Sequence, residues 1–150
     1  MTRVDDVAER DGWRCWLCDE PVDRSASGNE PRSPSIDTIV TKAKAKKGPS
    51  AVGEERLAHR ACNTGKGAIT PIVRWSDDLF VVDPSPILAT VERMDRKGGR
   101  EAMARCPTKA DAQAAATWLQ DRLSRLCPDL ALTTSVEAGG GQFLLILRRA

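Results

Sequence analysis

The stretch that decides the fold is LAHRACNTGKG, residues 57–67, which contains the only histidine of a 150-residue chain. His59 precedes Cys62 by three positions, and the earlier segment WRCWLC, residues 13–18, contains the pair Cys15 and Cys18. A two-residue spacer lets both side chains of a pair reach one ion from a tight turn, and zinc prefers four sulfur or imidazole ligands in a tetrahedron. The two pairs therefore predict one zinc site.

A site with four protein ligands is closed, so it leaves no position for a water molecule and is structural. Zinc at such a site contributes roughly 10–16 kcal/mol of apparent binding free energy to folding. The alternative interpretation is that these residues are buried thiols and a surface histidine. Cys106 and Cys127 have no second cysteine or histidine three positions away and are interpreted as small core residues.

The elements around these pairs are predicted from periodicity and turn residues. A short amphipathic helix is expected over TRVDDVAERDG, residues 2–12, with Thr2 as its cap. Strands are expected at SIDTIV, residues 35–40, and RLAHR, residues 56–60, separated by a polar, basic loop. A helix is expected to begin in ACNTGKG, so this half reads as strand, loop, strand, helix.

The composition of the sequence changes near residue 71, where Pro and Asp residues that interrupt regular structure surround one apolar run. We therefore place a connector at 71–83. This divides the chain into a module at 1–70 and a small α+β domain of unknown role at 84–150. Within the latter we expect a helix, a strand, an Ala-rich helix capped by Thr108, and a hairpin closed by three glycines. The predicted class is α+β throughout.

Composition limits the function. The formal net charge is only +2 although 29% of the residues are charged, which argues against a broadly basic coating. Aromatic residues make up 4%, so platforms for stacking single-stranded bases are scarce. There is neither an apolar leader nor a run of about 18 apolar residues, so we expect a cytoplasmic protein with no membrane partner.

At residues 3 to about 68 the chain resembles the HNH endonucleases, whose zinc-bearing members have the ββα-metal fold. The motifs of that family occur here in order as RDGWRCWLC, SIDTIV, TKAKAKKG and RLAHRACNTGKG. The two zinc pairs and the C-N-x-x-K-G ending are the most specific of them. The resemblance implies a zinc-stapled ββα module, an interaction with nucleic acid, DNA more than RNA, and a hydrolytic metal site.

Carried over position by position, the structural zinc ligands are Cys15, Cys18, His59 and Cys62. The residues that would hold a catalytic Mg²⁺ or Mn²⁺ are Asp37 and Asn63. The family's signature histidine, the general base, falls on Thr38. The asparagine that orients this histidine aligns with Glu54 or Glu55.

The loss of the histidine has a direct chemical consequence, because a threonine hydroxyl cannot accept a proton near neutral pH as imidazole does. A positioned general base contributes roughly 10²- to 10⁴-fold to a rate, so proficient cleavage is not expected by this route. Glu54 or Glu55 is the candidate for a replacement base.

Five lysines are candidates for contacts with phosphate. Four of them lie on the loop between the two predicted strands and the fifth begins the next helix: Lys42, Lys44, Lys46, Lys47 and Lys66. In the resembled fold this loop lies near the path of a duplex backbone. The alternative is that these lysines form an ordinary solvated face.

The leading expectation is a degenerate HNH module that keeps its zinc scaffold and a nucleic-acid surface, with protein or substrate contacts made by the C-terminal domain. One alternative is an active metal-dependent endonuclease with a substituted base. The other is a zinc-stabilised interaction or regulatory subunit of a nucleoprotein machine, which the near-zero net charge favours.

Overall fold

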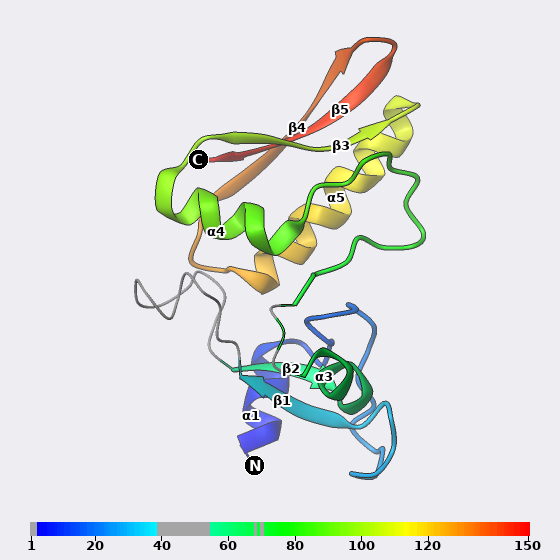
Figure 1. Cartoon of the computed structure of the whole chain (residues 1–150), viewed down its shortest axis with the longest axis vertical. Coiled ribbons are helices and arrows are strands. Elements are labelled where there is room, and N and C mark those ends of the chain that lie inside the picture. The colour runs from blue at the N-terminus through cyan, green and yellow to red at the C-terminus, as the bar shows by residue number, and fades with distance from the viewer. Residues whose placement is uncertain (1–2, 39–54, 68, 70) are drawn as a thin grey trace. The chain divides into compact units, whose positions relative to one another are not determined.

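The computed structural model describes residues 3–38, 55–67, 69 and 71–150, and the chain forms two compact units, residues 1–73 and 74–150. Each unit combines helices with a small antiparallel sheet (Figure 1), which confirms the predicted mixed α+β class. Among the described residues, no helix is both long enough and apolar enough to cross a membrane.

Unit 1 begins with α1 (Arg3–Arg10), which buries Val7 and Ala8 as the periodicity predicts, while its expected cap, Thr2, lies outside the described residues. The strands β1 (Pro34–Thr38) and β2 (Glu55–His59) pair antiparallel. The helix α3 (Arg60–Lys66) follows β2 without a loop. The predicted order of strand, strand and helix is therefore confirmed.

The apolar core of unit 1 is small, and its buried side chains include Trp16, Val22 and Leu57. Polar groups are buried among them, notably Asp11, Asp37 and His59. A buried polar group destabilises a fold unless it is hydrogen-bonded. The positions of the candidate site residues in this unit are therefore fixed by polar contacts as well as by packing.

Unit 2 contains the predicted helix, strand, helix and hairpin. These are α4 (Ile87–Lys97), β3 (Arg100–Cys106), α5 (Lys109–Leu126), β4 (Leu132–Gly139) and β5 (Gln142–Arg149). The strand order is β3-β5-β4, with a register shift between Ala102 and Ala104. The Thr108 hydroxyl accepts a hydrogen bond from the Asp111 amide at 3.1 Å, which confirms the predicted cap of α5.

The core of unit 2 forms where α5 packs on all three strands of the sheet. Leu119 and Leu123 of α5 are buried, as are Leu145 and Leu147 of β5. Cys106 and Cys127 are buried as well, in agreement with their interpretation as core thiols. Burial raises the pKa of Cys106.

The edge of β3 is extended by the segment that precedes α4. Val82 and Arg105 exchange backbone hydrogen bonds of 2.7 and 3.1 Å, and the Ser85 amide donates to the Met103 carbonyl at 2.7 Å. Part of the predicted connector is thus bound to the sheet of unit 2.

Candidate metal centre

The first cysteine pair lies in a tight turn that is closed by backbone hydrogen bonds. The Cys15 amide donates to the Glu20 carbonyl at 3.0 Å, and the Asp19 amide donates to the Cys15 carbonyl at 2.8 Å. Asp19 has a positive φ of 66°, a left-handed conformation that Asp tolerates better than most residues. The turn directs both thiols of the pair to one place.

The second pair comes from the junction between β2 and α3. His59 is the last residue of β2 and the N-cap residue of α3, and Cys62 lies in the first turn of that helix. His59 is almost completely buried, with 3% of its surface exposed. A strand that leads directly into a helix therefore brings the imidazole and the thiol together.

The four residues predicted from spacing form one cluster. Their ligand atoms, one for each of Cys15, Cys18, His59 and Cys62, all lie within 4.8 Å of one another. The Nδ1 atom of His59 is 3.3 Å from Sγ of Cys18 and 3.8 Å from Sγ of Cys62. This donor set and spacing can hold a metal ion such as zinc.

A hydrogen bond outside the cluster orients the histidine. Nε2 of His59 lies 2.8 Å from the carbonyl oxygen of Pro21, so this nitrogen carries the proton and donates it. The lone pair of Nδ1 then points toward the thiols, as a metal ligand requires. Metal-binding histidines usually donate their second N–H in this way, which fixes the tautomer and the plane of the ring.

The thiols of the first pair also share a proton. A hydrogen bond from Cys18 lowers the pKa of Cys15 to about 5, and the same bond raises the pKa of Cys18. Thiolate is the form of cysteine that binds metal, so a bound zinc ion would release the shared proton. The cluster thus already favours one thiolate.

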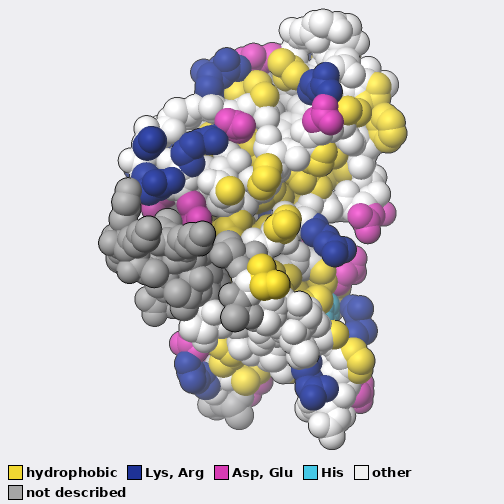
Figure 2. Space-filling view, viewed as in Figure 1, with side chains coloured by type: hydrophobic (Ala, Val, Ile, Leu, Met, Phe, Trp, Pro, Cys, Tyr) yellow, Lys and Arg dark blue, Asp and Glu magenta, His cyan; other side chains and the backbone are white. Residues whose placement is uncertain are grey.

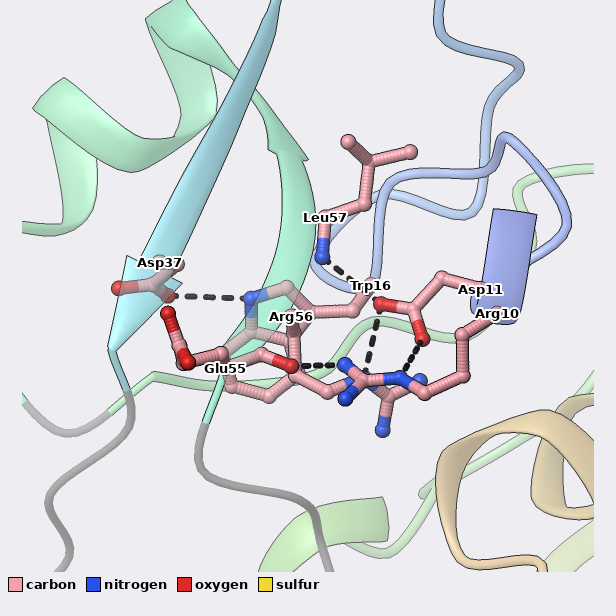
Figure 3. Close-up of polar contacts among 7 residues, drawn as sticks. All are labelled: Arg10, Asp11, Trp16, Asp37, Glu55, Arg56 and Leu57. Atoms are coloured by element: carbon pink, nitrogen blue, oxygen red, sulfur yellow. Dashed lines mark hydrogen bonds and ion pairs between the residues drawn. The ribbon is translucent and has the colours of Figure 1, made fainter. Parts of the chain in front are cut away.

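The aspartate of the expected catalytic site is buried and contacted at both oxygens. Asp37 is 3% exposed, and its Oδ2 accepts a hydrogen bond from the Trp16 indole at 3.0 Å (Figure 3). Its Oδ1 lies 3.2 Å from Nζ of Lys66, a side chain that is only 10% exposed. A Mg²⁺ or Mn²⁺ ion at Asp37 would have to displace this ammonium, so the observed arrangement does not leave the carboxylate open to a metal.

Asn63 reaches the same strand as Asp37. Its Nδ2 donates to Oγ of Ser35 at 3.2 Å and to the carbonyl of Ile36 at 3.0 Å. The amide therefore fastens α3 to β1 one turn before Lys66. The structure brings the two residues of the expected metal site to neighbouring positions, where both make structural contacts.

The candidate base positions lie where β1 ends and β2 begins. Thr38 is exposed and pairs in register with Glu55. The Glu55 carboxylate forms an ion pair with Arg3 of α1, and its backbone carbonyl accepts a hydrogen bond from Arg10. Glu54 and the loop lysines Lys42, Lys44, Lys46 and Lys47 lie outside the described residues.

Sequence reasoning did not identify the role of Asp11, whose carboxylate joins α1 to β2. Its Oδ2 accepts hydrogen bonds from Nε of Arg56 at 3.0 Å and from the Leu57 amide at 2.7 Å, and its Oδ1 accepts one from Nε of Arg10 at 3.1 Å (Figure 3). Asp11 and Arg56 are both buried. The dipeptide Arg10-Asp11 before the first cysteine pair is the sequence signal that points to this network.

No known family matches this chain, and no curated protein or solved structure shows significant similarity to it. The fold and the cluster define a mixed α+β protein with a candidate Cys3His metal centre in unit 1. The resemblance to HNH endonucleases stays a prediction.

Proposed function

We propose that unit 1 is a zinc-stapled, HNH-like module that binds nucleic acid and has lost proficient cleavage. The observation that carries this proposal is the contact between Lys66 and Asp37. It puts a fixed protein charge beside the carboxylate that, in the resembled family, would hold a divalent cation.

The proposed zinc has a structural role. A bound zinc ion would cross-link the turn at residues 15–18 to the junction of β2 and α3. Each partner is already oriented by the protein, His59 through Pro21 and Cys15 through Glu20. Four protein ligands leave no place for a reacting water molecule, so this centre does not supply hydrolytic chemistry.

Two features of the other site support the loss of cleavage. Thr38 offers a hydroxyl where a general base is required, and it cannot take a proton from water near neutral pH. Lys66 neutralises Asp37 in a buried environment where the Trp16 indole also donates to the carboxylate. The residue that would bind a metal is therefore engaged in contacts within the fold, and the position of the base lacks a group that can take the proton.

Nucleic acid is proposed as the partner because of the resemblance and because of the lysines between β1 and β2. Phosphate contacts from such a loop do not depend on a catalytic base, so binding can outlast cleavage. We expect DNA more than RNA. Lys66 is directed at Asp37, so within this proposal the phosphate contacts fall to Lys42, Lys44, Lys46 and Lys47.

The test is a binding and cleavage assay of the zinc-loaded full chain with a labelled DNA duplex in Mg²⁺ or Mn²⁺. We expect a complex to form without strand breaks. Efficient cleavage that is lost in Asp37→Ala would overturn the proposal, as would the absence of any complex at low salt.

A second candidate is an active nuclease in which Glu55 is the base. It is favoured by the register, which pairs Glu55 with Thr38 across the ladder. The ion pair between the Glu55 carboxylate and Arg3 opposes it, because the carboxylate is already engaged with a side chain of α1. Loss of cleavage in Glu55→Gln would identify this function.

A further inference from the structure

Five exposed cationic side chains gather where α4 ends, β3 begins and β5 ends. They form a surface that we call the basic corner: Arg96, Lys97, Arg100, Arg148 and Arg149. Arg100 and Arg148 pair directly across the ladder between β3 and β5. Figure 2 shows Lys and Arg side chains concentrated at this end of unit 2, with fewer acidic side chains among them.

Three of these arginines are held in place by the protein. Glu137 of β4 accepts hydrogen bonds from Arg100 at 3.0 Å and from Arg148 at 3.1 Å, so one carboxylate orients two guanidinium groups over the sheet. Nη1 of Arg149 donates to the carbonyls of Met94 and Asp95 at the end of α4, at 3.1 and 3.0 Å. Each guanidinium keeps further N–H donors for a ligand.

The charge at the basic corner is not balanced. The described contacts bring three acidic residues to its five cations, Glu137 through its carboxylate and Glu92 and Asp95 through backbone carbonyls, whereas the formal net charge of the whole chain is only +2. Arg93, on the same helix, is paired separately with Glu101. The basic corner therefore carries a local excess of positive charge.

The outer face of the sheet has side chains suited to a phosphate backbone. Cross-strand neighbours share a face, so Thr133, which pairs with Arg148, adds an exposed hydroxyl beside the two held guanidinium groups. Arginine guanidinium groups and hydroxyl groups are common hydrogen-bond donors to phosphate oxygens. The fixed orientation of the arginines lowers the entropy that binding would otherwise cost.

We infer that the basic corner is a second nucleic-acid contact, which binds the phosphates of a duplex independently of the metal centre. The inference rests on the proposed function for its choice of polyanion and assigns unit 2 a part in it. An acidic protein would also be attracted to these five cations. Preferential binding of the wild type to an acidic polypeptide is therefore one outcome that the test distinguishes.

The experiment is fluorescence anisotropy of the zinc-loaded full chain with a DNA duplex, titrated at several KCl concentrations. In Arg100→Ala/Arg148→Ala we expect affinity to fall about tenfold and the salt slope to fall by about 1.8, since each lost phosphate contact removes about 0.9. Arg74→Ala/Lys109→Ala has the same net charge and changes two exposed residues outside the corner. It should retain the wild-type slope.

Two further variants separate the effect of charge on binding from any effect on the folded structure. Arg100→Lys/Arg148→Lys keeps both charges and should recover most of the salt slope. Glu137→Gln removes one negative charge but keeps a side-chain oxygen that can accept from both arginines, so it should raise affinity a few-fold. Equal losses in the corner variant and the Arg74/Lys109 control would overturn the inference, as would binding of the wild type to acidic polypeptide but not to DNA.

The outcomes also distinguish this inference from the proposed function. If the basic-corner variant loses affinity and Lys42→Ala/Lys44→Ala/Lys46→Ala/Lys47→Ala does not, the inference stands and the role proposed for unit 1 fails. The reverse pattern rejects the basic corner and keeps the proposed function. If the wild type does not bind DNA at low salt, both fail.

Discussion

Nζ of Lys66 lies 3.2 Å from Oδ1 of Asp37, which is buried, and the Lys66 side chain is only 10% exposed. Removing one member of a buried ion pair leaves the other charge without compensation in a place that water does not reach. This contact also joins the end of α3 to the end of β1. The contact therefore stabilises unit 1. It also occupies the Asp37 carboxylate, which the sequence assigns to a catalytic metal.

Lys66→Ala should lower the free energy of unfolding of unit 1 by about 3–5 kcal/mol, the usual range for breaking a buried pair. Urea denaturation of the zinc-loaded protein, followed by tryptophan fluorescence, measures it. Lys109→Ala removes an equal charge from an exposed position and should change stability by less than about 0.5 kcal/mol. A loss in Lys66→Ala no larger than in this control would show that the contact contributes nothing.

Thr38→His should restore part of the missing chemistry. Alone, it is expected to give up to about 10²-fold more Mg²⁺- or Mn²⁺-dependent nicking, the low end of the contribution of a general base, because Lys66 still competes for Asp37. Adding Lys66→Ala should increase the gain by freeing the carboxylate, and Asp37→Ala should abolish it. Plasmid nicking measures all of these variants. Unchanged nicking in both His variants would show that Thr38 does not mark a lost base.

The metal cluster predicts one zinc ion per chain. Native mass spectrometry should find it in the wild type and not in Cys62→Ser, whereas Cys127→Ala, which removes a buried thiol outside the cluster, should keep it. Because the free energy of metal binding contributes directly to the free energy of folding, chelation should unfold unit 1 before unit 2. A metal-free protein that keeps the near-UV spectrum of the zinc-loaded form would contradict this role.

The loop lysines should act as independent phosphate contacts. Replacing any one of Lys42, Lys44, Lys46 or Lys47 by Ala should weaken binding to all duplex sequences alike and lower the salt slope by about 0.9. Anisotropy titrations at several KCl concentrations measure the slope. An unchanged slope in the quadruple variant would mean that these lysines form a solvated face.

The cluster could be predicted from the sequence because zinc chemistry dictates both the ligand types and the short spacing within each pair. The order of helices and strands followed from periodicity, and the Thr108 cap from the preference for a short side-chain acceptor. These signals are local. Each can be read within one turn or one strand.

The contacts of Lys66 and Asp11 could not be predicted because they join segments far apart in the chain. The sequence predicted Lys66 at the start of a helix, in position for a phosphate contact. This placement was wrong, because Lys66 is the last residue of α3 and its ammonium lies beside Asp37 of β1. Asp11 meets Arg56 only after α1 packs against the sheet. Which partner a charged side chain chooses depends on tertiary geometry, and its residue type alone does not reveal it.

The most direct test is one native gel in which the zinc-loaded wild-type protein is mixed with a labelled DNA duplex in Mg²⁺ or Mn²⁺ and the same samples are then run denatured. We predict a retarded complex in the native lanes and full-length strands in the denatured lanes. Cleaved strands that disappear in Asp37→Ala, or no retarded complex even at low salt, would contradict a zinc-stapled module that binds nucleic acid without cutting it.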